Sequence, residues 1–315
     1  MKIVITGGAG FLGQRLARRW LERQGGAVEI VLADRVATTA FDGEARIAAT
    51  VCDIADNADV QRLVTPDTAL VYHLAAIVSG QAEAEFDLGM KINLEATRSL
   101  LEAARRLGTA PKFVFASSVA VFGGDLPAIV TDATPARPQS SYGAEKAIGE
   151  LLVNEFSRRG FVDGRVLRLP TICVRPGKPN RAASSFVSGI MREPLNGEAA
   201  VCPVGREVPL WISSPAVAIE NLVHASLVPA ANFGAHRTVN LPGLTVTVGE
   251  MIDTLERVAG REVAARIRFE RDEAVARIVA SWPGKFATPR AEALGFTRDR
   301  DFESVLRACQ AEIHG

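Results

Sequence analysis

Apolar and polar residues follow two alternating rhythms along residues 1–172. Short, nearly continuous apolar runs are separated by longer stretches in which apolar residues recur at helical spacing. Continuous apolar runs are typical of strands with both faces covered, and the longer pattern is typical of amphipathic helices. Strands are predicted at 2–6, 28–34, 46–54, 69–76, 112–118 and 164–172, and helices at 11–23, 56–64, 83–107 and 140–160.

This alternation predicts an α/β protein with a doubly wound parallel sheet, because each strand reaches its parallel neighbour through a helical crossover. After Ile172 the rhythm is lost, and "CVRPGKPNRAASS" has the composition of a loop. Further on, a helix is predicted to start at Ser214, with Pro215 in its first turn, and "TVTVGEMIDTLERVAG" predicts a strand and a capped helix. We expect a sheet domain over 1–172, with 212–240 packing back on it, and a small C-terminal substrate lobe from 173–211 and 241–315.

Composition and charge narrow the class of protein. The 315 residues include 36 basic and 36 acidic side chains, which cancel, so the chain has no electrostatic footprint for nucleic acid or an anionic membrane. No apolar run reaches membrane-spanning length, and the N-terminal residues do not have the form of a secretory signal. The four cysteines are isolated from one another and form no metal-binding spacing. We expect a soluble cytoplasmic protein with reduced thiols and no metal site.

A glycine-rich turn joins the first predicted strand to the first predicted helix. Gly7, Gly10 and Gly13 in "TGGAGFLG" have the spacing GxxGxxG. Glycines there permit a sharp turn, a close approach to a pyrophosphate and tight helix–strand packing, and the helix N-terminus offers free N–H groups to the phosphates. A turn that binds nothing is the alternative, but the first strand–helix junction is where a dinucleotide site requires the motif. We therefore predict that 1–172 is a nucleotide-binding Rossmann domain.

Two acidic residues follow later strands. Asp34 ends the second strand, where a carboxylate accepts hydrogen bonds from the adenosine ribose and repels a 2′-phosphate. This favours NAD over NADP, although Arg35 directly after it would attract such a phosphate. Asp53 is placed to meet the adenine amino group, with Ile54 against the ring, and a helix N-cap is the other role open to Asp53.

The stretch "SSYGAEK" at 140–146 places Tyr142 and Lys146 four residues apart, on one face of a helix. A phenol has a pKa of about 10, and a neighbouring ammonium favours the phenolate and lowers that pKa. The pair suits a base that removes a proton from a substrate hydroxyl. An ordinary amphipathic turn has the same pattern, so these seven residues leave both interpretations open.

Together these segments resemble the extended branch of the short-chain dehydrogenase/reductase superfamily. The resemblance covers nearly the whole chain and also includes "HLAA" at 73–76, "FASSVAVFG" and "LRLPTICVRPG". It implies that Tyr142 is the catalytic base, that Lys146 activates it and bonds the nicotinamide ribose, and that Ser118 orients the substrate oxygen. Asn93 would either support the site or be structural. The implied NAD-binding residues are Gly7, Gly10, Phe11, Leu12, Gly13, Asp34, Asp53, Ile54, Leu74, Ala75, Tyr142, Lys146 and Ile172.

Departures from the branch's patterns indicate the reaction. Its dehydratases place an Asp-Glu pair directly after the catalytic Ser or Thr, whereas this chain has Val119 and Ala120, which neither donate nor accept a proton. Its nucleotide-sugar enzymes carry an Arg-Asp-aromatic motif before the late helix, and "EVPLWISSPAVAIENL" has no such arginine. A small acid therefore fits as substrate better than a nucleotide sugar.

The loop after Ile172 carries candidates for holding that acid. A carboxylate would meet a basic side chain or a hydroxyl of this loop, although these charges are equally typical of a solvated loop. The stretch resembles the D-erythronate dehydrogenases, which implies NAD-dependent oxidation of the C2 hydroxyl of a small sugar acid, D-erythronate, to 2-dehydro-D-erythronate. The candidate substrate residues are Ser79, Ser118, Tyr142, Arg175, Lys178, Arg181, Ser184, Ser185 and Trp211.

Two other functions stay open. One is a nucleotide-sugar 4-epimerase that keeps its NAD through turnover. The other is a non-catalytic dinucleotide-sensing regulator, although such relatives often lose the tyrosine or lysine that this chain keeps. The resemblance also implies a homodimer, in which residues 83–107 and 142–159 of two copies pair into a four-helix bundle.

Overall fold

A parallel sheet forms the centre of the molecule. The computed structural model describes residues 1–23, 28–38, 41, 43–177 and 181–314, and its largest sheet has seven parallel strands in the order β10-β6-β5-β4-β1-β2-β3. The chain builds outward from β1 to β3, returns to β4 and then builds in the opposite direction, which confirms the predicted doubly wound α/β fold. The strands are β1 (Lys2–Thr6), β2 (Glu29–Asp34), β3 (Ile47–Val51), β4 (Thr68–His73), β5 (Lys112–Ser118), β6 (Asp163–Leu169) and β10 (Thr238–Asn240).

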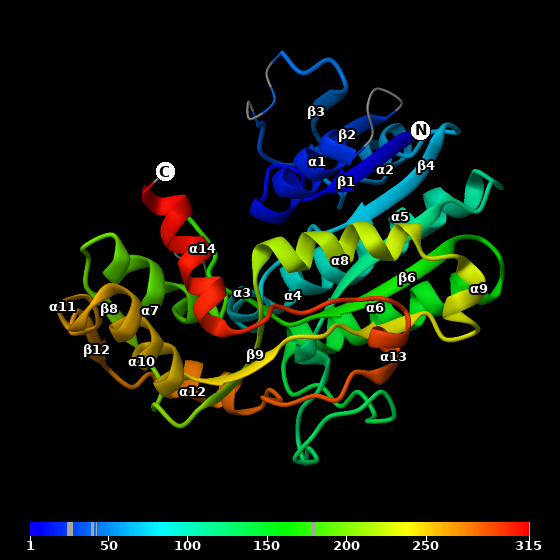
Figure 1. The fold of residues 1–315 in the computed structure, drawn as a ribbon. Coiled ribbons are helices and arrows are strands. Elements are labelled where there is room, and N and C mark those ends of the chain that lie inside the picture. Colours follow the sequence, from blue (N-terminus) through cyan, green and yellow to red (C-terminus); the bar gives the residue numbers. More distant parts are fainter. Residues whose placement is uncertain (24–27, 39–40, 42, 178–180, 315) are drawn as a thin grey trace.

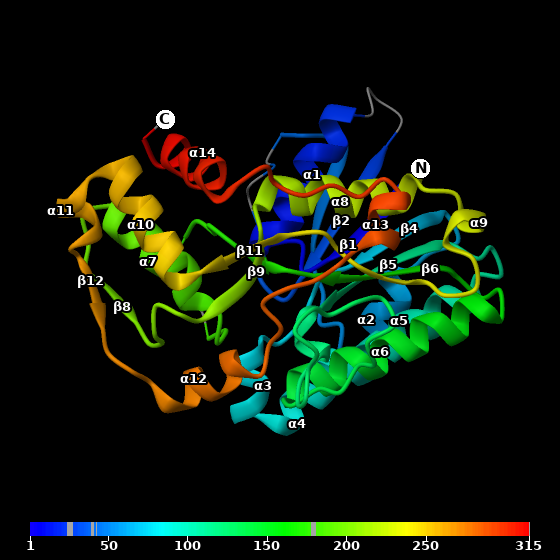
Figure 2. The same ribbon diagram turned by 60° about the horizontal axis from the view of Figure 1, so that its bottom comes forward.

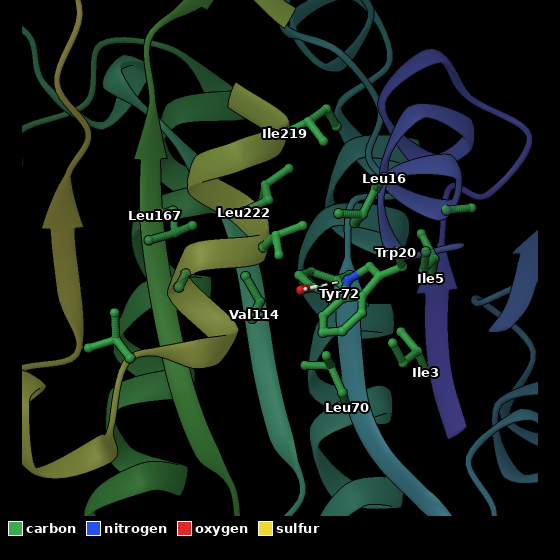
Figure 3. Close-up of a cluster of buried hydrophobic side chains, with 14 of the residues drawn as sticks. Ile3, Ile5, Leu16, Trp20, Leu70, Tyr72, Val114, Leu167, Ile219 and Leu222 are labelled. Atoms are coloured by element: carbon green, nitrogen blue, oxygen red, sulfur yellow. Dashed lines mark hydrogen bonds between the residues drawn. The ribbon is translucent and has the colours of Figure 1, made fainter. Parts of the chain in front are cut away.

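Helices cover both faces of this sheet (Figures 1 and 2). Successive residues of β1 point to opposite faces, so Ile3 and Ile5 join one buried cluster and Val4 joins another. Figure 3 shows the first cluster, in which Trp20 and Leu222 from two helices pack over the strands. One face carries α1 (Phe11–Arg23) and α8 (Pro215–Leu227), and the other carries α2 (Asn57–Leu63), α5 (Ala96–Arg106) and α6 (Ser141–Arg158).

A second core lies in the smaller lobe, at the left of Figure 1. A three-stranded sheet of β11, β9 and β7 links it to the end of β6. The elements of this region are β7 (Thr171–Ile172), α7 (Ser185–Leu195), β8 (Ala200–Cys202), β9 (Pro209–Ser213), β11 (Leu244–Thr247), α10 (Val248–Ala259), α11 (Arg261–Ala264), β12 (Ile267–Phe269), α12 (Glu273–Ala280) and α14 (Phe302–His314).

Part of the C-terminal region returns to the sheet domain. The short helices α9 (Ala230–Phe233) and α13 (Pro289–Ala293) lie on its side, and Ala291 and Phe296 are buried in the cluster that contains Ile3. Leu306 of α14, by contrast, is buried in the lobe. The described residues from 241 onward therefore contribute to both cores, and the lobe is not continuous in sequence.

The helix predicted over 83–107 is interrupted in the structure. It is divided into α3 (Ser79–Ala84), α4 (Phe86–Gly89), a π-helical turn η1 (Met90–Glu95) and α5. Glu85 separates α3 from α4 because its backbone, with φ −129° and ψ 68°, is not helical. The apolar spacing survives both irregularities, so the sequence pattern did not reveal them.

Two predicted helix starts are confirmed in the structure, and one strand of the large sheet was not predicted. Ser214 caps α8 as predicted, since its Oγ accepts a hydrogen bond from the backbone N–H of Val217 at 3.2 Å. The helix predicted in "TVTVGEMIDTLERVAG" begins with a capping box formed by Thr247 and Glu250. The seventh strand, β10, was not predicted, because three residues are too few to show a periodicity.

Within the described ranges, no helix is both long enough and apolar enough to cross a bilayer.

Candidate functional site

A cavity of about 480 Å³ lies along the carboxyl edge of the sheet. The residues that follow β1, β2, β4, β5 and β6 all contribute to its wall. It spans the point where the strand order reverses between β1 and β4, which is where open α/β sheets bind ligands. The far wall comes from the loop after β7 and from the small lobe.

The glycine loop forms one wall of this cavity. Gly7 has φ +72°, a conformation that favours glycine, and a Cβ there would lie 2.9 Å from the backbone nitrogen of Ala75. A Cβ on Gly13 would lie 2.4 Å from the carbonyl oxygen of Gly7. The loop is therefore packed against its own helix and against the end of β4 so closely that side chains are excluded. This cradle at the start of α1 fits the pyrophosphate of a dinucleotide.

Asp34 ends β2 and lines the same cavity, together with Arg35. Its carboxylate accepts hydrogen bonds from the backbone N–H groups of Ala9 at 3.1 Å and Val36 at 3.3 Å. Each oxygen keeps a further lone pair for a ribose hydroxyl. Asp34 thus both fixes the glycine loop and presents an acceptor to the cavity.

Asp53 does not lie on the cavity wall, although Cys52 and Ile54 on either side of it do. Its carboxylate accepts the backbone N–H of Ala55 at 3.0 Å, and this local turn uses the side chain. The N-cap of α2 is Asp56. The fold therefore brings Ile54 to the predicted cofactor site, and Asp53 lies beside it with its Oδ1 in a local turn.

The three predicted catalytic residues all line the cavity. Ser118 is the last residue of β5, Tyr142 lies in the first turn of α6, and Lys146 follows one turn later. Lys146 is 2% exposed, and its Nζ lies 4.7 Å from the ring centre of Phe115 and 5.6 Å from that of Tyr142. The Ser118 hydroxyl lies close enough to the Tyr142 phenol to lower the pKa of that phenol. A hydroxyl, a phenol and an ammonium group therefore meet at one place on the sheet edge.

Burial is the largest influence on the pKa values of Tyr142 and Lys146. It raises the pKa of Tyr142 to about 12, against the lowering effect of the Ser118 hydrogen bond, and Glu145 raises it further. Burial also lowers the pKa of Lys146 to about 8, while Glu145 and Glu150 act in the opposite direction. Lys146 was expected to lower the pKa of this phenol. In the protein by itself burial is the largest effect, and the pKa of Tyr142 stays above its ordinary value.

Asn93 supports the site without lining the cavity. Its Oδ1 accepts the backbone N–H of Ile77 at 2.8 Å, and its Nδ2 donates to the carbonyl oxygen of Ile77 at 3.0 Å and to Glu145 Oε2 at 2.5 Å. Ile77 is part of the cavity wall. Asn93 therefore holds the backbone beside the site, which combines the two roles that the sequence left open.

Several predicted substrate residues converge at the lobe side of the cavity. Arg175, Ser184 and Ser79 all line it. The Oγ of Ser79 accepts the backbone N–H of Ala183 at 3.1 Å, so its own O–H stays available as a donor. No carboxylate in the described ranges forms an ion pair with Arg175.

Trp211 is the predicted substrate residue that the fold places elsewhere. It is buried, its ring centre lies 5.0 Å from that of Phe286, and its Nε1 donates to the carbonyl oxygen of Leu241 at 3.3 Å. This packing turns it away from the cavity wall. Arg181 also lies off the wall and pairs with Glu85 at 2.6 Å. Lys178 falls outside the described residues.

A different tryptophan, Trp282, lines the cavity after the end of α12, and Ser188 of α7 lies there too. The indole N–H of Trp282 has no acceptor among the described residues. No sequence motif marks these positions, because they reach the site through the packing of the lobe. No group of three His, Cys, Asp or Glu side chains in the described part of the chain is arranged to hold a metal ion.

Comparison with known proteins places this site in a family. The family model described as the NAD dependent epimerase/dehydratase family matches residues 3–218. A D-erythronate dehydrogenase of Cupriavidus necator is 54% identical to this chain, over 98% of this chain and 97% of its own. A D-erythronate dehydrogenase of Haemophilus influenzae is 48% identical, over 98% of both chains.

A solved structure is similar to this chain in fold. The structure described as the nucleoside-diphosphate-sugar epimerase from Agrobacterium tumefaciens has a TM-score of 0.91 and 42% identity, over 98% of this chain and 93% of that one. The family match contains the glycine loop, Asp34, Ser118, Tyr142 and Lys146. This chain therefore belongs to the NAD-dependent epimerase/dehydratase family.

Proposed function

We propose that this protein is an NAD-dependent dehydrogenase that oxidises the C2 hydroxyl of D-erythronate to give 2-dehydro-D-erythronate. The observation that carries the proposal is the identity of 54% and 48%, over 98% of this chain, to two proteins named D-erythronate dehydrogenase. The cavity that joins the glycine loop to Ser118, Tyr142 and Lys146 supports it.

The cofactor would lie along the carboxyl edge of the sheet. The glycine loop would hold its pyrophosphate, Asp34 the adenosine ribose, and Lys146 the nicotinamide ribose. Asp34 supports NAD rather than NADP because its carboxylate would repel a 2′-phosphate, and Arg35 is the residue that would weaken this preference. When bound, NAD⁺ supplies the hydride acceptor and a positive charge beside the phenol.

The protein side of the reaction is removal of a proton. The Ser118 hydroxyl would orient the substrate oxygen, and the Tyr142 phenolate would take its proton as the C2 hydrogen leaves with its electron pair. The pKa of about 12 for Tyr142 in the protein alone means that nearby positive charge is needed to populate the phenolate. Lys146 is already present in that state, on the same helix face, so the additional positive charge would come from the bound NAD⁺.

Arg175 is the best-placed group for the substrate carboxylate. Burial and the neighbouring Arg192 both lower the pKa of its guanidinium from its ordinary value. An anion bound beside Arg175 would offset both effects, because it supplies the opposite charge. Ser184 and Ser79 would add hydroxyl donors.

The test is a panel of four- to six-carbon aldonates with NAD⁺ or NADP⁺, followed by the absorbance of the reduced cofactor. We expect turnover with D-erythronate and NAD⁺, and much weaker turnover with NADP⁺. Formation of no NADH from any aldonate would exclude the proposed reaction.

A nucleotide-sugar 4-epimerase is the second candidate, because the similar solved structure at 42% identity is described as an epimerase. An epimerase returns the hydride to the sugar and releases no NADH. A nucleoside-diphosphate sugar that raises the melting temperature, while aldonates do not, would favour it over the dehydrogenase.

A further inference from the structure

A buried carboxyl group lies beside the catalytic pair and has no role in the chemistry described above. Glu145 is 1% exposed and lies between Tyr142 and Lys146 on α6. Its Oε2 accepts a hydrogen bond from Asn93 Nδ2 at 2.5 Å, and its Oε1 has no partner among the described residues. A buried carboxylate is costly to keep, so its presence requires an explanation.

The contacts of Glu145 lead from the catalytic helix to the cavity wall. Asn93 uses its amide to hold both backbone polar groups of Ile77, at 2.8 and 3.0 Å, and its remaining N–H to hold Glu145. Ile77 lines the cavity. The chain Glu145–Asn93–Ile77 therefore joins the turn that carries Tyr142 and Lys146 to a second segment of the same cavity wall.

The neighbouring backbone is shaped around this chain of contacts. Asn93 lies in the π-helical turn η1, and such turns are frequent at functional sites. The residue before η1 is Gly89, where a Cβ would lie 2.3 Å from Glu145 Oε1. Both the irregular helix and the glycine thus leave room for this carboxyl group.

We propose that Glu145 is a positioning residue: through Asn93 it fixes the Tyr142–Lys146 turn of α6 against the Ile77 wall of the cavity. This inference rests on the proposed dehydrogenase function. Glu145 acts through other residues and touches neither the substrate nor the reacting atoms.

The charge of Glu145 supplies a readout that a structural role alone would not affect. The charged side chains that act on Glu145 are Lys146 on its own helix and Glu83 on α3. From the other two neighbouring elements, η1 contributes the neutral side chain of Asn93, and α4 contributes the backbone of Gly89. The carboxylate raises the pKa of Tyr142 and that of Lys146. Loss of the charge therefore lowers both, and activity that depends on a phenolate and an ammonium extends to lower pH.

Two substitutions separate position from charge. Glu145→Gln keeps an oxygen that accepts from Asn93 but removes the charge, whereas Glu145→Ala removes both. Glu155→Gln is the matched control, because Glu155 is an exposed glutamate of the same helix, paired with Arg158. Each variant is assayed with D-erythronate and NAD⁺ across pH, and its melting temperature is measured.

We expect Glu145→Ala to lower kcat by about tenfold to a hundredfold with little change in KM, since small displacements of catalytic groups have effects of this size. Glu145→Gln should retain most of the kcat at its own optimum, with the whole pH profile displaced to lower pH, and Glu155→Gln should match the wild type. A profile of Glu145→Gln that superimposes on that of the wild type would overturn the proposal, as would a Glu145→Ala enzyme with wild-type kcat.

The experiment distinguishes this proposal from the function on which it rests. A wild-type enzyme that forms no NADH from D-erythronate overturns both, whereas an active wild type with insensitive Glu145 variants overturns the positioning role alone. If Glu145→Ala does not fold, the normalised pH profile of Glu145→Gln decides, because its shape does not depend on the folded fraction.

Discussion

Tyr142 carries its hydroxyl into a cavity where burial raises the pKa of the phenol to about 12. A side chain that is hard to ionise in the protein alone becomes a useful base only when positive charge gathers around it. Lys146, whose Nζ lies 5.6 Å from the ring centre, is already present in that state. In the proposed reaction, the additional charge would come from bound NAD⁺.

Replacement of Tyr142 by Phe tests this role. Loss of a general base is expected to lower kcat by about 10²- to 10⁴-fold. The affinity for NAD, measured by quenching of tryptophan fluorescence, should stay near the wild-type value, because the ring and Lys146 remain. A variant that retains more than a tenth of the wild-type kcat would exclude Tyr142 as the base.

A second residue-scale prediction concerns the substrate carboxylate. Arg175→Met removes a cavity-lining guanidinium that has no carboxylate partner among the described residues. The KM for D-erythronate should rise by about tenfold to a hundredfold, because the loss of a charge-assisted hydrogen bond has an effect of this size. Arg181→Met is the control, because Arg181 pairs with Glu85 and is 61% exposed. Steady-state kinetics check both, and an equal rise in KM for the two variants would argue against a specific role of Arg175.

At the scale of elements, the glycine loop is the junction that organises the cofactor site. Three segments meet there: the end of β1, the start of α1 and the residues after β4. The loop was recognised from sequence because its glycines have a fixed spacing. The structure explains why glycine is required there, since Gly7 and Gly13 leave no room for a Cβ.

Gly13→Ala is therefore expected to weaken NAD binding and to lower the melting temperature, because its Cβ would lie 2.4 Å from the carbonyl oxygen of Gly7. Gly189→Ala in α7 is the matched control, since its Cβ would approach only the Glu193 side chain, at 3.4 Å. Fluorescence titration and thermal unfolding measure the two effects. Wild-type NAD affinity in Gly13→Ala would contradict the tight packing of this loop.

The interrupted helix shows where element-scale prediction failed. The apolar spacing of 83–107 indicated one helix, but Glu85 breaks it and η1 adds a π-helical turn around Asn93. Neither feature changes the apolar pattern. Asn93 in η1 contacts Glu145 of α6 and the backbone of Ile77, and Glu85 pairs with Arg181. Those contacts involve residues distant in sequence.

At the scale of the whole molecule, apolar side chains stay exposed on the side of α4 and α6. Phe86 is 56% exposed, Ile148 40% and Leu151 70%. These lie on the segments that the family resemblance assigns to a four-helix dimer interface, and large exposed apolar residues that gather on one side are typical of such surfaces. The homodimer remains a prediction.

Leu151→Glu is expected to convert a dimer to a monomer, because it would place a charge within an apolar interface. Phe269→Glu, at a 49% exposed position on β12 in the small lobe, should leave the oligomeric state unchanged. Light scattering after size-exclusion chromatography gives the mass of each. A wild type that is monomeric at micromolar concentration would rule out the predicted dimer.

The sequence by itself determined the class of fold and indicated the glycine loop, Asp34 and the pair Tyr142 and Lys146. Each of these is encoded locally, as an apolar periodicity, as a glycine requirement, as an acid at the end of a strand or as a fixed spacing on one helix. The catalytic interpretation of that pair, and the choice of Ser118, came from the resemblance of the whole chain to a family, because the local pattern alone left two interpretations open.

Only the tertiary structure decided the rest of the site. It placed Trp282 rather than Trp211 on the cavity wall. It directed the Asp53 carboxylate to a local hydrogen bond with the backbone of Ala55, and it joined Glu145 to Ile77 through Asn93. These outcomes depend on which distant segments pack together, and on how closely, so no local pattern records them. The sequence indicates the reaction, because its residues follow local patterns. It does not indicate the candidate substrate contacts, because these depend on how the small lobe packs against the sheet.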